Sequence, residues 1–319
     1  MKLHINLWKN FLNFLPQMFN RTVLELLTIK IEQMTIESTN DNNNTKPAIT
    51  YSECYQQCFC SDNLELMKTI ESNTIDLIYC DILYGTGRNF GDYQDLKPIR
   101  SEIEAHYLPR LKEMHRVLKS TGSIYLQMDY RIVHWLRCIM DDVFGYNNFR
   151  NEIIWSYKRY TGICRNFQTM HDNILRYSKS ENYTFHQLFQ PYQPTTLKNH
   201  KWEYDEINGT YFYWKRGKNT HPYKIHANKN GVKMNDVWDI PQLSPISNER
   251  YDFTSQKPKA LIERIIKASS NENDLVADFY LGSGTTAEVC KDLNRNFIGC
   301  DINPRAVEIT LQRLNDARS

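Results

Sequence analysis

Two short stretches, far apart in the chain, each combine an acid, an aromatic ring and a glycine-containing turn at the end of an apolar run. The first is Asp76-Leu-Ile-Tyr-Cys-Asp81-Ile-Leu-Tyr84-Gly-Thr-Gly87, and the second is Asp274-Leu-Val-Ala-Asp278-Phe-Tyr280-Leu-Gly282-Ser-Gly284-Thr-Thr286. Such an apolar run is typical of a buried strand, and the turn follows at the strand's carboxyl end. Ligands bind at that edge of an open α/β sheet. We therefore expect the two turns to lie side by side, one holding a cofactor and the other a target group.

The second turn has features of a nucleotide-binding site. Gly282 and Gly284 let the backbone approach a ligand closely just ahead of a predicted helix. The next apolar run ends in Asp301, about twenty residues after the glycines, where an acid commonly accepts hydrogen bonds from ribose hydroxyls. Dinucleotide sites and S-adenosylmethionine sites share this pattern, so these residues by themselves leave the cofactor open.

The rest of the chain predicts helices that alternate with strands, which is typical of a doubly wound, mostly parallel α/β sheet. Strands are expected at 76–80, 123–128, 152–157, 172–177, 274–278 and 297–301. Helices are expected at 61–71 (capped by Ser61 or Asp62), at 101–122 (with a Ser101 and Glu104 capping box), at 131–143, from Pro258, at 285–293 and from Pro304. Residues 181–240, dense in Tyr, Trp, His, Lys, Asn and Pro, interrupt this alternation.

Composition and charge narrow the class of protein. The 319 residues are 41% hydrophobic and 24% charged, which is ordinary for a globular protein. The formal charge of +2 means that any affinity for nucleic acid must come from a local basic surface. The 8 cysteines are scattered and no secretory signal is seen, which favours a cytoplasmic setting. Cys54, Cys58 and Cys60 lack a second pair or suitably spaced histidines, so no metal site is expected.

Residues 1–48 are expected to form an extension and a polar linker outside the working domain. Residues 3–31 are rich in Leu, Phe and Ile, but Lys9, Arg21, Glu25 and Lys30 interrupt them before they reach the length of a membrane span. An amphipathic helix, or sequence upstream of a start at Met34, explains them better, and no membrane association is expected. Residues 49–180 and 241–319 are then two halves of one domain, separated by the insertion at 181–240.

Several motifs together resemble the β-group of the DNA amino-methyltransferases, which methylate exocyclic amino groups with S-adenosylmethionine. They are Phe253-Thr-Ser-Gln256-Lys257-Pro258, Leu261-Ile-Glu-Arg-Ile-Ile266, the Asp278 to Thr286 turn and Gly299-Cys-Asp301-Ile-Asn-Pro304. Asp81-Ile-Leu-Tyr84 falls where the family has Asp-Pro-Pro-Tyr, and the segments 151–155 and 171–177 resemble its later strands. The resemblance covers roughly residues 50–178 and 236–313, with the catalytic motif first and the cofactor motif last, as in the β-group.

The resemblance implies a seven-stranded methyltransferase sheet, with S-adenosyl-L-methionine at the switch point between the strands that end at Asp278 and Asp81. It implies a cofactor-binding role for Asp278, Tyr280, Gly282, Gly284, Thr285, Asp301, Gln256, Lys257 and Pro258. The residues of the 278–284 turn would line the methionine end, Asp301 would bind the ribose, and 256–258 would close over the pocket. Tyr280 stands where the family usually has Phe, and it keeps the face of the ring.

The same resemblance implies that Asp81 and Tyr84 are catalytic. The lone pair of an aromatic amine is delocalised into the ring, so an acceptor such as Asp81 is needed to draw the nitrogen towards a tetrahedral shape. Tyr84 would stack on a base that has left the duplex. Ile82 and Leu83 replace both prolines of the family motif, which removes two fixed φ angles and predicts a more flexible turn.

The insertion is the expected target-recognition region, and double-stranded DNA is the expected partner. Aromatic and basic side chains interleave there, and such a surface can hold phosphates and contact base edges. The candidate DNA-binding residues are Lys215, Arg216, Lys218 and Lys224, together with Arg165 in the loop after the 152–157 strand. The alternative is an aromatic subdomain core with a solvated lysine face.

We therefore expect site-specific methylation of adenine amino groups in DNA, in a restriction–modification setting. Asp at the first motif position fits adenine, and methylation of cytosine amino groups is the alternative within the family. Two further alternatives are a DNA-binding relative that has lost turnover and a Rossmann dehydrogenase, whose glycine fingerprint would usually open the chain. The recognition sequence, a separate cognate endonuclease and a homodimer are left open.

Overall fold

The computed structural model describes residues 56–315, except 92, 160–161, 163–164 and 218–220. The predicted extension at 1–48 and the candidate Lys218 lie outside the described residues. In the part of the chain that is described, no helix combines the length and the apolar character needed to span a bilayer.

An eight-stranded sheet forms the centre of the fold, in the order β1-β13-β12-β2-β3-β5-β4-β11. These strands are β1 (Gln57–Cys60), β2 (Ile75–Asp81), β3 (Leu118–Met128), β4 (Phe149–Ser156), β5 (His171–Ser178), β11 (Val237–Asp239), β12 (Leu275–Asp278) and β13 (Asn296–Asp301). Every neighbouring pair is parallel except the two that β5 makes with β3 and β4. The predicted mostly parallel α/β sheet is thus confirmed, with β11 as one strand more than the seven expected.

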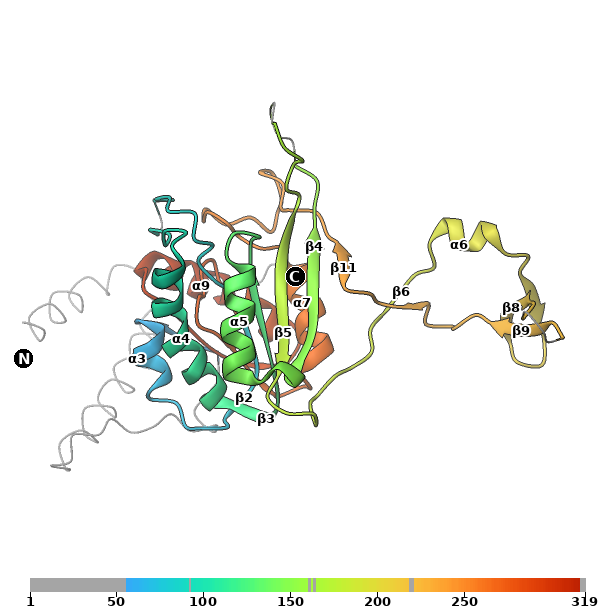
Figure 1. The fold of residues 1–319 in the computed structure, drawn as a ribbon, viewed down its shortest axis with the longest axis horizontal. Helices are drawn as coiled ribbons and strands as arrows, with labels where there is room; N and C mark the ends of the chain where they lie inside the picture. Colours follow the sequence, from blue (N-terminus) through green and yellow to red (C-terminus); the bar gives the residue numbers. More distant parts are fainter. Residues whose placement is uncertain (1–55, 92, 160–161, 163–164, 218–220, 316–319) are drawn as a thin grey trace, which may run out of the picture. The chain divides into compact units, whose positions relative to one another are not determined.

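Helices cover both faces of this sheet (Figure 1). One face packs against α3 (Asn63–Met67), α4 (Arg100–Val117) and α5 (Val133–Phe144), and the other against α7 (Lys259–Ser269), α8 (Thr285–Asp292) and α9 (Pro304–Asn315). Successive residues of β2 serve the two cores alternately: Ile78 and Cys80 join the first, Leu77 and Tyr79 the second. A strand buried on both faces reads as a continuous apolar run, which explains the 77–80 sequence.

The strand order reverses between β2 and β12. From β2 the chain continues to β3 on one side, and from β12 it continues to β13 on the other. Val276 is paired with Leu77 and Ala277 with Ile78, so the carboxyl ends of the two strands open at the same edge of the sheet. Asp81 and Asp278 therefore end neighbouring strands, as the sequence predicts.

The stretch between β5 and β11 builds two small sheets of its own. β6 (Phe189–Gln190) pairs with β10 (Val232–Lys233), and β7 (Glu203–Asp205), β8 (Thr210–Lys215) and β9 (Tyr223–His226) form an antiparallel sheet near α6 (Pro194–Asn199) in the sequence. Phe212 is buried, and the ring of His200 stacks on that of Tyr213 with 3.9 Å between centroids. Aromatic side chains thus supply part of the core of this insertion.

Of the two predicted helix N-caps, the one at α3 is confirmed and the one at α4 is wrong. The Asp62 carboxylate accepts hydrogen bonds from the amides of Leu64 and Glu65, so it caps α3 as predicted. The Ser101 and Glu104 capping box does not form, because α4 begins at Arg100 and Ser101 already lies inside it. Glu104 instead accepts a hydrogen bond from Arg100 Nε at 2.6 Å.

The end of α4 also differs from the expectation. The helix stops at Val117, and the chain passes directly into β3 at Leu118 rather than ending at Gly122. Leu118 pairs with Ile75 of β2, so the residues after Val117 pair within the sheet instead of continuing the helix. Pairing with a strand distant in sequence is a tertiary interaction, and a helix-stop residue such as Gly122 does not encode it.

Gly284 joins the glycine turn to α8 and is held by packing against α9. Its φ is +75°, and a Cβ placed there would lie 2.3 Å from Thr310 Oγ1. Gly91, with φ +83°, offers a matched control because a Cβ there would meet nothing within 4 Å. Gly91→Ala should cost only the strain of a left-handed alanine, on the order of 1–2 kcal/mol. We expect Gly284→Ala to cost about 2 kcal/mol more, because Thr310 must be displaced.

This difference is measured by urea unfolding of the two variants and the wild type without added ligand. Equal losses at the two positions would show that α9 yields freely and that the close packing at Gly284 does not constrain the fold.

Candidate active site

Three carboxylates end neighbouring strands at one edge of the sheet: Asp81 on β2, Asp278 on β12 and Asp301 on β13. Asp278 is 2% exposed, and its carboxylate accepts hydrogen bonds from the Thr286 hydroxyl (2.6 Å) and the Tyr280 amide (3.0 Å). Burial raises the pKa of Asp278 to about 7; the two hydrogen bonds oppose the rise, and the charge of Asp81 adds to it. Three carboxyl groups thus meet at this edge, and a cationic ligand bound there would favour their ionised forms.

A small pocket lies at the glycine turn, and its lining includes both Asp278 and Asp81. Five of the predicted cofactor residues line it: Lys257, Asp278, Tyr280, Gly282 and Thr285. Its volume is about 30 Å³, whereas pockets for drug-sized ligands measure roughly 300–1,000 Å³. Phe253, Ser255 and Lys257 complete the lining just before α7, so a nucleoside-sized cofactor requires this lining to open.

Two further residues of the predicted cofactor-binding set, Asp301 and Gly284, stabilise the glycine turn. The Asp301 carboxylate accepts hydrogen bonds from the amides of Gly282 and Asn303, both at 2.9 Å. Gly284 packs against Thr310, as described above. A turn that exposes backbone between two strand-end carboxylates fits S-adenosylmethionine, which carries ribose hydroxyls, an ammonium and a sulfonium.

Gln256 and Pro258, the last two of the set, organise the segment ahead of α7. The Gln256 side chain accepts from the Tyr251 amide at 2.8 Å and donates to the Glu249 carbonyl at 2.6 Å. Pro258 is the N-cap of α7. Both residues shape the segment that carries Lys257, and their contact with a cofactor stays a prediction.

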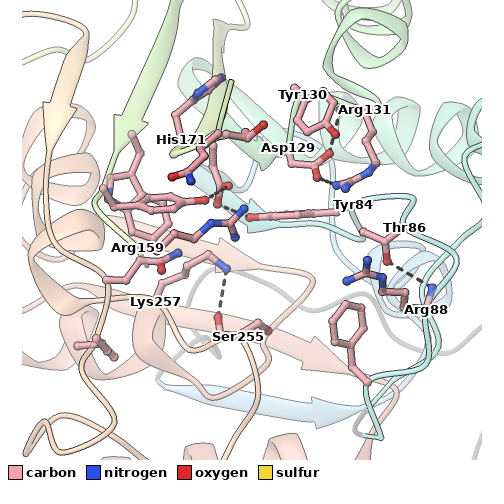
Figure 2. A pocket seen from close by; sticks show the side chains of 18 of the residues that line it. Tyr84, Thr86, Arg88, Asp129, Tyr130, Arg131, Arg159, His171, Ser255 and Lys257 are labelled. Carbon is pink, nitrogen blue, oxygen red and sulfur yellow. Dashed lines mark hydrogen bonds and ion pairs between the residues drawn. The ribbon is translucent and has the colours of Figure 1, made fainter. Parts of the chain in front are cut away.

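Lys257 forms an ion pair with Asp81, and their side chains are only 11% and 19% exposed. Lys257 Nζ also donates to the Ser255 carbonyl at 3.1 Å (Figure 2). Burial raises the pKa of Asp81; the Lys257 cation opposes this rise, and the charge of Asp172 adds to it. Lys257 therefore helps to keep a nearly buried carboxylate ionised. The sequence placed Lys257 in the cofactor set but did not predict this partner.

Tyr84 lies within hydrogen-bond distance of two carboxylates. Its hydroxyl is 2.8 Å from Asp81 Oδ1 and 2.8 Å from Asp172 Oδ2. Gln127 Nε2 donates to the Tyr84 oxygen at 3.2 Å and to Asp172 Oδ2 at 3.1 Å, and Tyr157 donates to Asp172 Oδ1 at 2.9 Å. These bonds tie the turn after β2 to both β3 and β5.

The turn is anchored at both positions where it lacks a proline. The Ile82 side chain is 3% exposed, and its amide donates to the Gln127 carbonyl at 3.2 Å. A proline at this position could not donate that hydrogen bond. The Leu83 carbonyl accepts from the Tyr107 hydroxyl of α4 at 2.9 Å. Hydrogen bonds to β3 and α4 thus restrain a backbone that two prolines would otherwise have fixed.

A larger cleft of about 620 Å³ includes Tyr84, Asp172 and Lys257 in its lining. In Figure 2, Tyr84 lies near the centre of this cleft, with Arg159 and Lys257 reaching towards it. The arginines that line the cleft are Arg88, Arg131, Arg159, Arg165 and Arg250. Among the described residues, only Arg131 of these five forms an ion pair with a carboxylate. Exposed arginines without carboxylate partners, close to aromatic rings, suit phosphates and stacked bases.

The predicted DNA-binding residues divide into three groups. Arg165 lines the large cleft, whose lining also includes Tyr84 and Arg159. Lys215 and Arg216 are exposed at the end of β8, in the insertion. Lys224 instead pairs with Asp205 at 3.2 Å and lies 4.1 Å from the centroid of the Phe212 ring, which matches the alternative of an aromatic core with a lysine face.

Sequence reasoning did not single out Asp172, Gln127, Tyr157 or Arg159. A signal was available for Asp172, because it is an acid next to the start of an apolar run within a segment that resembles a family strand. Gln127 offered less, since one polar residue near the end of a strand is common. The strand order β2-β3-β5-β4 brings these four residues to the same edge as Asp81.

Comparison with known proteins identifies close relatives. Residues 75–312 match the N6/N4 family described as DNA methylase. The Type II methyltransferase M.HpaI of Haemophilus parainfluenzae is 32% identical over 82% of this chain and 74% of its own. The DNA adenine methyltransferase YhdJ of Escherichia coli (strain K12) is 30% identical over 80% of this chain and 81% of its own.

Solved structures share the fold. The structure of an M1.HpyAVI–SAM complex has a TM-score of 0.51 and 20% identity, covering 82% of this chain and 99% of its own. The PvuII DNA methyltransferase, titled cytosine-N4-specific, has a TM-score of 0.56 and 17% identity, covering 87% of this chain and 92% of its own. At these identities the likeness supports the architecture alone.

Replacement of Lys257 by methionine should leave Asp81 without its cation and raise the pKa of Asp81 further. A carboxyl whose folded-state pKa lies above its unfolded-state value loses stability as the pH rises between the two values. We therefore expect Lys257→Met to match the wild type at low pH, where Asp81 is protonated in both proteins. At neutral pH it should be less stable by about 1.5–3 kcal/mol, the usual worth of a hydrogen bond to a charged group.

Guanidinium unfolding over a series of pH values measures this difference. Lys267→Met is the control, because Lys267 is an exposed lysine on α7 paired with Glu263, and it should show little change at any pH. A stability difference for Lys257→Met that does not vary with pH would contradict the proposed influence on Asp81.

Proposed function

The chain belongs to the DNA methylase family of amino-methyltransferases, and we propose that its target is the exocyclic amino group of adenine at a specific DNA site. Membership of the family makes it an S-adenosylmethionine-dependent DNA methyltransferase. The observation that carries the proposal is the position of Asp81, whose carboxylate borders the small cofactor-side pocket and bonds to two residues of the large cleft, Tyr84 and Lys257.

Two observations support adenine over cytosine. YhdJ, a relative over 80% of this chain at 30% identity, is named a DNA adenine methyltransferase. Asp81 stands at the first position of the catalytic motif, where the family's cytosine enzymes often have Ser. The PvuII structure, which is titled cytosine-N4-specific, is related at only 17% identity and supports the fold alone.

Asp81 activates the amino group in this proposal. Bound S-adenosylmethionine supplies an electrophilic methyl group, and the target nitrogen needs a lone pair directed at it. Asp81 accepts an amino hydrogen and draws the nitrogen out of conjugation with the ring. Lys257 already donates an N–H to this carboxylate, so Asp81 is placed to accept hydrogen bonds from nitrogen. The target amino group can approach Asp81 only after the Lys257 ammonium has moved away from the carboxylate.

The large cleft receives the extruded base and the DNA around it. Tyr84 presents its ring there, and the exposed arginines, together with Lys215 and Arg216 in the insertion, would hold phosphates. Several relatives, including M.HpaI and M1.MboII, are named Type II methyltransferases. These names support a restriction–modification role for this chain, while a separate endonuclease and a homodimer stay predictions.

Asp81→Asn should abolish methylation, because an amide is a poor substitute for a carboxylate as acceptor. The protein is incubated with mixed-sequence DNA and S-adenosylmethionine labelled in the methyl group. We expect the wild type to label DNA and Asp81→Asn to label it at least about 100-fold more slowly. Glu102→Gln, which changes an exposed acid of α4, serves as the control that should keep full activity.

Nucleoside analysis of the labelled DNA then names the base. N6-methyladenine supports the proposal, and N4-methylcytosine assigns the alternative within the family. No transfer by the wild type, despite measurable binding of S-adenosylmethionine and DNA, would favour a binding protein without turnover.

The cleft arginines should determine how strongly DNA binding depends on salt. Each phosphate contact contributes about 0.9 to the slope of log K against log salt. Arg159→Gln/Arg165→Gln should therefore weaken binding to all sequences and lower that slope by about 1–2, as measured by fluorescence anisotropy with a labelled duplex. Lys267→Gln, a change of an exposed lysine paired with Glu263 on α7, should leave the slope as in the wild type. An unchanged slope in the double variant would place the phosphate contacts elsewhere.

A further inference from the structure

Asp172 is a second buried acid beside the catalytic motif, and the proposed chemistry so far gives it no part. It is 5% exposed and lies on β5, the one strand of the sheet that is antiparallel to its neighbours. Three side chains approach its carboxylate: Tyr84 and Gln127 at Oδ2, and Tyr157 at Oδ1. A buried charge is stable only when it is hydrogen-bonded in this way.

The contacts of Tyr84 leave the network one proton short. The phenol has a single hydrogen, but its oxygen is 2.8 Å from both Asp81 Oδ1 and Asp172 Oδ2. Burial, followed by the charges of Asp172 and Asp81, raises the pKa of Tyr84 well above its ordinary value, so the phenol keeps that hydrogen. One of the two oxygen–oxygen contacts therefore contains the phenol hydrogen and the other does not, so Tyr84 donates to only one of the two carboxylates at a time.

We propose that Asp172 is a positioning residue, whose carboxylate takes over the Tyr84 hydrogen bond when Asp81 accepts the proton that leaves the target amino group. This inference rests on the proposed methyltransferase function and assigns a further residue of the same site. Asp172 itself touches neither target nor cofactor in this role, and it acts through the Tyr84 hydroxyl.

The proton balance of the reaction changes Asp81 from a carboxylate to a carboxylic acid and so changes what Tyr84 can donate to. The amino nitrogen forms a bond to the methyl carbon, the carbon–sulfur bond breaks with its electron pair on sulfur, and one N–H proton leaves. Asp81 takes that proton on Oδ2, the oxygen that Lys257 contacts in this structure, so Oδ1 loses negative charge and becomes a weaker acceptor for the Tyr84 hydroxyl. The Tyr84 hydrogen then turns from Asp81 Oδ1 to Asp172 Oδ2, an oxygen of the carboxylate that has not taken a proton. No oxidant, reductant or further reactant is needed.

Gln127 keeps this exchange local. Its amide donates to both the Tyr84 oxygen and Asp172 Oδ2, and its own carbonyl oxygen accepts from Tyr79 at 2.8 Å. The Gln127 side chain is thereby fixed in one orientation, and it holds the phenol oxygen still while the hydrogen changes partner. The switch therefore needs only a rotation of the Tyr84 O–H bond.

Several titratable groups from the surrounding elements face Asp81. The effect of a substitution on the pKa of Asp81 depends on the charges of these groups. They are Tyr79 and Cys80 of β2, Tyr84 of the turn, Asp172 of β5, Lys257 ahead of α7 and Asp278 of β12. The negative charge of Asp172 raises the pKa of Asp81. Asp172→Asn should therefore shift the acid limb of the rate profile to lower pH, whereas loss of Lys257 would shift it to higher pH.

The test compares Tyr84→Phe, Asp172→Asn and the double variant in single-turnover methyl transfer, with saturating S-adenosylmethionine and DNA. Each single variant should lower the rate constant at least about tenfold, while the dissociation constants for DNA and S-adenosylmethionine change less than about twofold. The double variant should be no slower than the slower single variant at a pH where Asp81 is ionised in all variants, because without the hydroxyl Asp172 has no hydrogen-bonded link to Asp81. Tyr125→Phe, which removes a buried hydroxyl bonded to Ser269, is the matched control and should keep the wild-type rate.

Three results would overturn this role: an unchanged rate in Asp172→Asn, rate losses that multiply in the double variant, or a loss of DNA affinity as large as the loss of rate. If Asp172→Asn does not fold by circular dichroism, Tyr84→Phe decides the question, because it keeps the ring and must still lower the rate tenfold. Absence of transfer by the wild type would overturn the proposed function together with this role. An active wild type with an unaffected Tyr84→Phe would overturn only the role of Asp172.

Discussion

The burial of the Asp81 carboxylate at the switch point of the sheet is the constraint on which the site depends. A carboxylate removed from water is costly unless charges and hydrogen bonds compensate it, and here the partners come from distant parts of the chain. Lys257 arrives from the segment ahead of α7, and Tyr84 from the turn that follows β2. The sheet order makes this possible, because α7 leads into β12, which lies directly beside β2.

The ion pair between Lys257 and Asp81 lies at the boundary of two cavities, one proposed for the cofactor and the other for the target base. Lys257 borders both the small pocket over the glycine turn and the large cleft that contains Tyr84. With the pair formed, the Lys257 cation opposes the rise that burial causes in the pKa of Asp81, and a nitrogen donor occupies the Asp81 carboxylate. The Lys257 ammonium thus occupies the carboxylate oxygen that the proposed chemistry assigns to the target amino group.

Much of the framework follows from local sequence. The 77–80 run predicts a strand buried on both faces, Asp62 caps α3, and the strands that end at Asp81, Asp278 and Asp301 are found where the pattern predicts them. The strands β1 and β11 are absent from the six expected ones. α4 differs at both ends, because its start lacks the Ser101 and Glu104 box and its last expected residues belong to β3. Both ends of α4 depend on packing and on pairing with distant strands. The residues next to these ends in the sequence therefore do not predict where the helix begins and stops.

The sequence by itself determined which residue types stand at the ends of the strands, because buried strands and glycine turns are encoded within a few residues. It therefore predicted Asp81, Tyr84 and the 278–284 turn as one site and indicated the family. Only the tertiary structure decided what each of these groups contacts. Lys257 is 176 residues from Asp81, and Asp172 is 88 residues from Tyr84. The spacing of residues along the chain carries no information about such pairs, since the order and direction of the strands bring them together.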